Sequence, residues 1–181
     1  MDFQNSQTKD NLMRAFAGES QARNRYTFAG AIAAKKGHHM LADVFYFTAN
    51  QEKEHAEIFY NHLKELTGKS IMVDGSYPVD TYDDVLSLLK SARHNEYEEY
   101  EDVYPHFGTI AREEGFHKIA QDFFNIAEIE KTHGRRFEKM ATLLENGQLY
   151  ASQQPCCWMC LNCGFVFEGT QAPQQCPVCL H

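Results

Sequence analysis

The chain has 181 residues, of which 43% are hydrophobic, and its formal net charge at pH 7 is -8. This composition is ordinary for a folded globular protein, and the acidic balance argues against nucleic acid or an anionic membrane as the main partner. No apolar run approaches the ~20 residues that span a bilayer, and the first residues lack the pattern of a secretory signal. We therefore expect a cytoplasmic protein that is not bound to a membrane.

Residues 5–147 have apolar side chains at the three- and four-residue spacing of amphipathic helices. Breaks fall at residues 36–37, 68–78 and 114–115, and Gly147 ends the pattern. We expect four helices, at about 5–36, 38–67, 82–113 and 116–146. Pro105 lies inside the third and predicts a kink there. Two hairpins joined by one long crossover describe a mainly α, ferritin-like four-helix bundle.

Each of the four apolar stripes is interrupted near its middle by a carboxylate or an imidazole. The interrupting residues are Glu19, then Glu52 and His55, then Glu96 and Glu99, and last Glu130 and His133. Burying one unpaired charge costs several kcal/mol, and like charges add repulsion. Two divalent cations would supply four positive charges against five carboxylates. A mixture of carboxylate and imidazole suits iron, manganese or zinc, so the stripes predict a dimetal site.

Two of these clusters, Glu52 with His55 and Glu130 with His133, have the spacing Glu-x-x-His. Residues three apart share a helix face, so each pair could hold one metal from one side. The alternative is that the helical phase is wrong and these are ordinary surface charges. That interpretation fits the acidic residues that lie off the stripes: Glu54, Glu57, Glu98, Glu101 and Glu128. We also expect surface or partly buried structural roles for His62, His106 and His117.

The two predicted hairpins look like diverged copies of one another. Glu19 precedes Glu52 by 33 residues, and Glu96 precedes Glu130 by 34. A tyrosine follows the first glutamate of each hairpin: Tyr26 seven residues after Glu19, and Tyr104 eight residues after Glu96. This repeat predicts that the two metals are related by a local twofold axis.

The end of the chain has a different composition, because all six cysteines lie between residues 156 and 179 and every Lys and Arg lies before 147. We expect a helical domain over 1–147, a linker over 148–155 and a small module over 156–181. A module this short usually needs a metal or disulfides, and a reducing cytoplasm favours the metal. The spacing C-x2-C-x12-C-x2-C predicts one tetrahedral thiolate site, which could hold structural zinc or redox-active iron. Its ligands are Cys160, Cys163, Cys176 and Cys179. Cys156 and Cys157 are expected to be spare thiols.

The two parts together resemble rubrerythrins over essentially the whole chain. The residues that carry the resemblance are Glu19 with Tyr26, Glu52 to His55, Glu96 and Glu99 followed by Tyr104-Pro105, Glu130 to His133, and WMCLNCGFVFEGTQAPQQCPVC near the end. Two features depart from the family's pattern. The sequence stops at His181, two residues after the last cysteine, and Leu180 stands where many rubredoxin-type turns have a small residue.

The resemblance implies a role for each candidate residue. Glu52 and Glu130 would bridge two irons, with Glu19 and His55 on one iron and Glu96 and His133 on the other. Glu99 would exchange with His55 when the redox state changes. Tyr26 and Tyr104 would hydrogen-bond to the ligands, and the four cysteines would hold one rubredoxin-type iron.

The resemblance also implies an oxidoreductase, a peroxidase that reduces hydrogen peroxide to water in oxidative-stress defence. Its electrons would come from a donor such as a rubredoxin or a reductase. The expected assembly is a homodimer or a higher homo-oligomer, in which the rubredoxin-like module of one subunit faces the di-iron site of the other. Two other interpretations stay open: a ferroxidase that handles iron, as in other ferritin-like bundles, and a non-enzymatic protein with a zinc ribbon.

Overall fold

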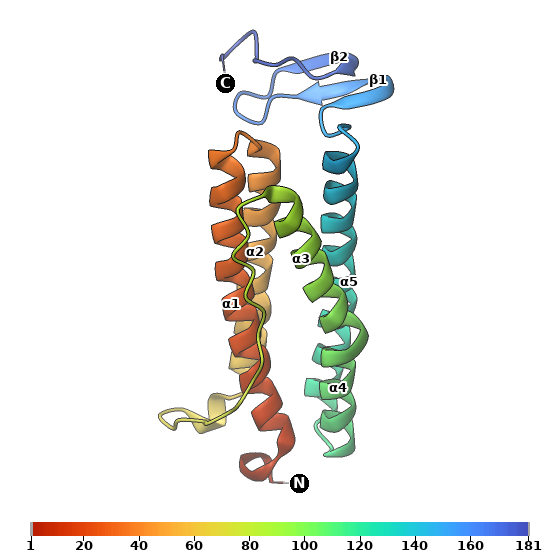
Figure 1. Ribbon diagram of the computed structural model, residues 1–181. Coiled ribbons are helices and arrows are strands. Elements are labelled where there is room, and N and C mark those ends of the chain that lie inside the picture. The colour runs from red at the N-terminus through yellow and green to blue at the C-terminus, as the bar shows by residue number, and fades with distance from the viewer. Residues whose placement is uncertain (1, 181) are drawn as a thin grey trace. The chain divides into compact units, whose positions relative to one another are not determined.

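The computed structural model describes residues 2–180, which form two compact units, one up to Glu138 and the other from Lys139. The helices are α1 (Gln7–Lys35), α2 (His39–Asn61), α3 (Val85–Glu98), α4 (Tyr104–Glu113) and α5 (His117–Glu145) (Figure 1). Short 3-10 turns lie at Phe3–Asn5 and Lys64–Leu66. Because α3 and α4 follow one another as one long helix, the predicted bundle of four helices with a long crossover is confirmed.

The helices of both hairpins begin and end at residues whose chemistry explains the boundary. Ser6 caps α1 by accepting a hydrogen bond from the Lys9 amide, and Asp84 caps α3 by accepting one from the Ser87 amide. The two tight turns between antiparallel helices contain Gly37 at φ 80° and Gly115 at φ 92°. These left-handed backbone conformations favour glycine, so the chain reverses sharply at both places.

Two predicted helix boundaries are wrong in detail. The second helix was expected to run to residue 67, but α2 ends at Asn61 and a 3-10 turn follows at Lys64–Leu66. The third was expected to be continuous from 82 to 113 with a kink at Pro105. It begins at Val85 and contains a π-helical turn over Glu99–Val103. Pro105 lies in the first turn of α4, where a missing amide hydrogen is tolerated because the wider π turn precedes it.

The crossover between α2 and α3 runs along α1 (Figure 1) and is fastened there by charged side chains. The Arg14 guanidinium donates to the backbone oxygen of Asp74 at 2.9 Å and to its carboxylate at 2.7 Å. Further along, Arg25 forms an ion pair with Asp80 at 3.0 Å, and Asn95 of α3 donates to the same carboxylate at 2.8 Å. The crossover therefore ties the first hairpin to the second.

Aromatic side chains fill the bundle core on both sides of the buried acidic residues. On one side Tyr104 packs against Phe59 and Phe123, with ring centroids 5.4 and 6.0 Å away. On the other side Tyr26 packs against Phe45 and Phe137, at 6.3 and 5.1 Å. The four phenylalanines are fully buried. Burial of this much apolar surface is the main source of stability for the bundle.

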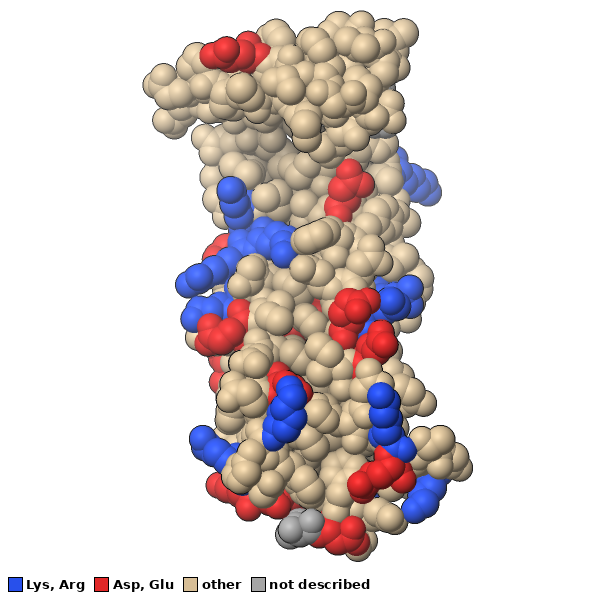
Figure 2. All heavy atoms as spheres, turned by 180° about the vertical axis from the view of Figure 1, so that it is seen from behind, with Lys and Arg blue, Asp and Glu red and all other residues tan. Residues whose placement is uncertain are grey.

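The second unit contains two antiparallel strands, β1 (Ala151–Met159) and β2 (Val166–Gln171), with a register shift between Ala151 and Cys156. The Trp158 indole donates to the Gly169 carbonyl oxygen at 2.9 Å and closes the hairpin. β1 begins at Ala151, within the predicted linker over 148–155. On the face drawn in Figure 2, charged side chains are spread over the helical part, whereas the strand unit is almost entirely uncharged.

Among the described residues, no helix is both long enough and apolar enough to cross a bilayer.

Candidate metal centres

The structure brings six of the seven predicted bundle ligands together at one level of the helical core. Glu19 comes from α1, Glu52 and His55 from α2, Glu96 from α3, and Glu130 and His133 from α5. None of the six is more than 5% exposed. The surface-charge alternative is therefore wrong for these residues.

The six residues form two groups of four that share Glu52 and Glu130. One group contains Glu19 and His55, the other contains Glu96 and His133, and the ligand atoms within each group lie within 4.8 Å of one another. Each shared carboxylate offers one oxygen to each group. The His55 Nδ1 lies 3.1 Å from Glu52 Oε2 and 2.9 Å from Glu130 Oε1. The His133 Nδ1 lies 3.0 Å from Glu52 Oε1 and 2.8 Å from Glu130 Oε2.

These atoms are close to one another, yet they do not have hydrogen-bonding geometry. Both oxygens of Glu52 and of Glu130, and the Nδ1 atoms of His55 and His133, are buried without a hydrogen-bond partner. Their lone pairs converge on common points instead. Two ligands that each bind one ion at about 2.1 Å, at right angles, lie about 3 Å apart, which is the separation seen here. The donor set therefore fits two neighbouring metal ions bridged by two carboxylates.

Two buried tyrosines orient the outer carboxylates. The Tyr104 hydroxyl donates to Glu19 Oε1 at 2.6 Å, and the Tyr26 hydroxyl donates to Glu96 Oε1. Each tyrosine thus reaches from one hairpin to a carboxylate of the other. Such hydrogen bonds set the direction of a ligand's free lone pairs and are part of a metal site as much as the ligands are.

The electrostatics of the cluster favour the binding of cations. Burial raises the pKa of Glu19 and of Glu96 well above the ordinary value, and repulsion from the shared carboxylates adds to it. Burial alone would lower the pKa of the two histidines. The surrounding carboxylates outweigh it and raise the pKa of His55 to about 10 and that of His133 to about 12. The carboxylates thus favour positive charge at both histidine positions.

Glu99, the seventh predicted ligand, belongs to neither group of four. It is the first residue of the π turn and is only half-buried. Burial and the charges of Glu96 and Glu130 raise the pKa of Glu99, so it lies close enough to interact with the cluster. The structure therefore places Glu99 beside the metal centre, while His55 occupies a ligand position within it.

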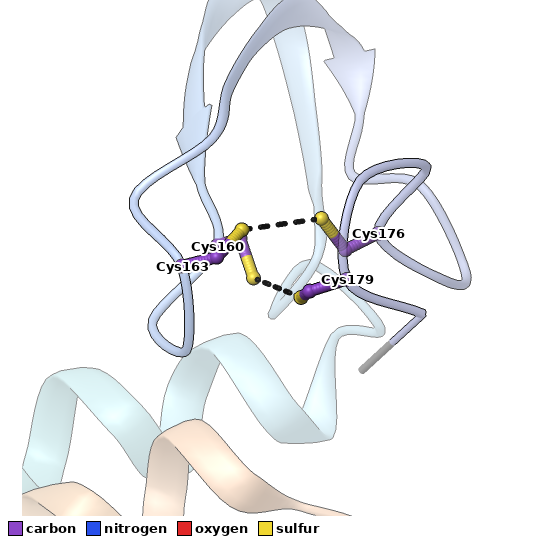
Figure 3. A group of neighbouring side chains, drawn as sticks. All are labelled: Cys160, Cys163, Cys176 and Cys179. Atoms are coloured by element: carbon purple, nitrogen blue, oxygen red, sulfur yellow. Dashed lines mark hydrogen bonds between the residues drawn. The ribbon is translucent and has the colours of Figure 1, made fainter.

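The four predicted cysteines of the small module converge on a second site, as Figure 3 shows. Their sulfur atoms lie within 4.8 Å of one another, with Cys160 and Cys179 at 3.7 Å and Cys163 and Cys176 at 3.6 Å. Sulfurs bound at about 2.3 Å around a tetrahedral ion are separated by about 3.8 Å, so the cluster fits one metal. The two other cysteines lie on β1, paired with Gly169 and Glu168 of β2, and outside this group.

The two cysteine turns have the same backbone pattern with different residues at one position. The Gly164 amide donates to the Cys160 carbonyl oxygen, and the Leu180 amide donates to the Cys176 carbonyl oxygen, both at 2.9 Å. Gly164 has φ 78° and Leu180 has φ 60°. The second turn therefore holds a leucine in a left-handed conformation that costs an ordinary residue roughly 1–2 kcal/mol.

Comparison with known proteins agrees with both sites. The family model described as Rubrerythrin matches residues 10–141, and the one described as Rubrerythrin, rubredoxin-like domain matches residues 158–181. The chain is 43% identical to a rubrerythrin of Clostridium perfringens over 177 residues, which are 97% of this chain and 91% of that protein. The chain belongs to the rubrerythrin family. A rubrerythrin of Porphyromonas gingivalis is 41% identical, over 97% of this chain and 86% of that protein.

Comparison with solved structures agrees with this family assignment. The fully reduced, all-ferrous state of nigerythrin superimposes with a TM-score of 0.69 at 26% identity, covering 97% of this chain and 86% of that one. The bundle cluster is therefore the carboxylate/histidine di-iron site of the family, and the cysteine cluster is its rubredoxin-like site.

Sequence reasoning missed the π turn and the ion pair that fastens the crossover, whereas it did name Tyr26, Tyr104 and Glu99. The signal for the π turn was present, because Tyr104 follows Glu96 by eight residues while Tyr26 follows Glu19 by seven. A π turn adds one residue to a helix, and this one restores the equivalence of the two tyrosines. The fastening of the crossover by Asp80 had no comparable signal, because contacts between distant segments leave no periodic pattern.

Proposed function

We propose that this protein is a non-haem di-iron peroxidase that reduces hydrogen peroxide to water in cytoplasmic oxidative-stress defence. The observation that carries the proposal is the sharing of Glu52 and Glu130 by both ligand groups. Two irons held by these two shared carboxylates would lie side by side and would act together as Lewis acids on one peroxide. A site for single-ion storage or a purely structural role does not need this arrangement.

The reaction consumes one peroxide, two electrons and two protons, and it yields two water molecules. When bound, the two irons would supply the electrons and Lewis acidity. Glu52 and Glu130 hold the reacting centre from both sides, and Tyr26 and Tyr104 keep the outer carboxylates oriented through their hydrogen bonds. Glu99 would offer a further negative charge beside the centre when the irons are oxidised.

The ligand groups support a particular division of roles. Glu19 and His55 would hold one iron, and Glu96 and His133 the other. Glu99 would replace His55 when the redox state changes, and its position beside the centre but outside both groups supports that exchange.

The four-cysteine site supports delivery of electrons one at a time to the di-iron centre. Rubredoxin-type iron is a one-electron carrier, and a protein that only stored iron would not need such an inlet. A rubredoxin or a reductase would supply this site, and the working assembly would be a homodimer or a higher homo-oligomer.

Anaerobic stopped-flow of the fully reduced, iron-loaded protein tests the proposal. Hydrogen peroxide should oxidise the di-iron site at least ten times faster than dioxygen, with one peroxide consumed for every two electrons. Faster reaction with dioxygen would favour a ferroxidase instead. A colourless protein whose cysteine site holds zinc after expression in iron-rich medium would favour a non-enzymatic role.

A further inference from the structure

A pocket of about 280 Å³ lies between α1, the crossover and the helix formed by α3, the π turn and α4. Its lining includes Gly18, Tyr77, Glu99, Val103 and Tyr104. Glu99 is the carboxylate beside the di-iron centre, and Tyr104 donates directly to the ligand Glu19. The pocket therefore reaches the residues that surround the metals.

The burial of the lining residues distinguishes the outer rim of the pocket from its inner end. Ser76, Glu98, Asp102 and His106 are exposed, so they form its rim. Buried residues form its inner end: Ala15, Gly18, Asn95 and Tyr104. The pocket therefore runs from an exposed, charged rim to a buried inner end.

The middle of the crossover covers this pocket and is held at both ends. Asp74 is bound by Arg14, and Asp80 by Arg25 and Asn95. Between them Tyr77 donates its hydroxyl hydrogen to the Arg14 carbonyl oxygen at 3.0 Å. The Tyr77 ring faces α1, because a methyl group added at Gly18 would lie 3.6 Å from its Cε1 atom. Gly18 thus leaves open space beneath the ring.

The charges that line the pocket favour an uncharged molecule over an anion. The guanidinium groups of Arg14 and Arg25 pair with Asp74 and Asp80, while the exposed Glu98 and Asp102 add negative charge at the rim. An anion would be repelled, and a polar neutral molecule would not. The volume is below the roughly 300–1,000 Å³ typical of sites for drug-sized ligands.

We propose that this pocket is the entry route for a small uncharged molecule to the di-iron centre and that Tyr77 sets its width. Identifying that molecule as hydrogen peroxide rests on the proposed function above. The route itself rests on the pocket, its gradient of burial and its inner contact with Glu99 and Tyr104.

Narrowing the pocket at Gly18 tests the route. Gly18→Leu fills the space beneath Tyr77, and Gly18→Ala, whose methyl group fits at ordinary contact distance, is the matched control. Iron content and absorption spectrum are checked first. Nitric oxide, a neutral diatomic ligand of ferrous iron, should then bind the reduced Gly18→Leu protein at least ten times more slowly than wild type. Gly18→Ala should stay within twofold. An unchanged rate in an iron-loaded Gly18→Leu protein overturns the route.

Widening the pocket at Tyr77 gives a second test. Unlike Gly18, which precedes the ligand Glu19, Tyr77 is not adjacent in sequence to a metal ligand. Tyr77→Ala removes the ring, and Tyr77→Phe keeps the ring but removes the bond to Arg14. The rate with tert-butyl hydroperoxide, relative to hydrogen peroxide, should rise at least fivefold in Tyr77→Ala and stay near the wild-type ratio in Tyr77→Phe. Equal ratios in all three proteins would contradict a gating role for Tyr77. If nitric oxide enters as expected but no protein reacts with peroxide, the proposed function fails while the route stands.

Discussion

In the first hairpin Tyr26 lies seven residues after Glu19, and in the second Tyr104 lies eight residues after Glu96. The two hairpins otherwise correspond position by position, including the ligands and the aromatic residues around them. The corresponding runs are Phe45, Glu52, His55, Phe59 and Phe123, Glu130, His133, Phe137. Their spacings are identical, and all of these side chains are at most 5% exposed.

Close contacts between the helices repeat as well. A methyl group added at Gly30 of α1 would lie 2.7 Å from the Tyr46 ring of α2, and one added at Gly108 of α4 would lie 2.7 Å from the Phe124 ring of α5. In each hairpin an aromatic ring therefore packs directly on a glycine of the preceding helix. This agreement supports a local twofold relation between the two metal positions.

The single extra residue of the second hairpin is accommodated by the π turn. Its first residue, Glu99, lies three residues after Glu96, where the first hairpin has the buried Ala22 three residues after Glu19. At the level of the ligands the difference between the hairpins lies on the side of the centre where the pocket opens. Symmetry positions the two metals, and the departure from symmetry provides the additional carboxylate.

The largest expected effect comes from removing either shared carboxylate. If Glu52 and Glu130 are equivalent, Glu52→Ala and Glu130→Ala should each reduce the iron in the bundle from two ions per chain to nearly none. Metal analysis measures this, with the cysteine-bound iron as an internal reference. Glu128→Ala, which changes an exposed residue of α5, is the control. Retention of both ions in one variant and loss in the other would break the twofold relation.

The stability of the metal-free protein should depend on pH through one histidine from each hairpin. Near the carboxylates the pKa of His55 is raised from 6.5 to about 10 and that of His133 to about 12. The stabilisation from their protonated forms is complete below pH 6.5 and is lost as pH rises through those values.

The melting temperature of the metal-free protein should therefore fall by about 5 °C or more between pH 6 and pH 9. Loaded protein, whose cations replace these protons, is the control and should change much less. Calorimetry at several pH values measures both forms. A metal-free protein that became more stable with rising pH would contradict the compensation of charge by protons.

Glu99→Ala makes the second hairpin resemble the first at the position of Ala22. Because Glu99 lies outside both ligand groups, the variant should retain two irons in the bundle. The reaction of the reduced protein with peroxide should slow about tenfold or more, since the compensating charge is gone. Glu101→Ala, at an exposed position of the same π turn, should react like wild type. Unchanged kinetics in Glu99→Ala would remove this residue from the mechanism.

Features with a regular spacing along the chain could be predicted from the sequence, and the others could not. The ligands, the tyrosines and the cysteines were found because helical stripes and chelating turns repeat at fixed spacings. The ends of α2 and α3 were harder to predict from the sequence, because the 3-10 and π turns there depend on local geometry. Contacts between distant segments, such as Asp80 with Arg25, depend on how the crossover lies over α1 and carry no spacing signal.

The role of Glu114 also could not be predicted from sequence spacing. Its substitution has the smallest effect that we expect. It lies in the turn after α4, at the place that corresponds to Lys36 after α1. Its carboxylate accepts hydrogen bonds from the Gln7 amide at 2.9 Å and the Thr8 amide at 2.8 Å, at the start of α1. Lys36 instead lies near Asp84, the residue that caps α3. Among the described residues, only the turn with Glu114 therefore makes hydrogen bonds to the first turn of the opposite hairpin.

Replacing this carboxylate with an amide tests the contribution of these hydrogen bonds. Burial alone would raise the pKa of Glu114, but the hydrogen bonds from Thr8 and Gln7 outweigh it and hold the pKa below the ordinary 4.5. Glu114→Gln should lower the free energy of unfolding by about 1 kcal/mol at pH 7, a typical value for a charged cap that is partly exposed. The loss should be complete above pH 4.5 and shrink as pH falls through the lowered pKa of Glu114. Urea unfolding at pH 7 and at pH 4, with Glu113→Gln at a neighbouring exposed position as the control, measures the difference. An equal loss at both pH values would show that the contact depends on the shape of the side chain and not on its charge.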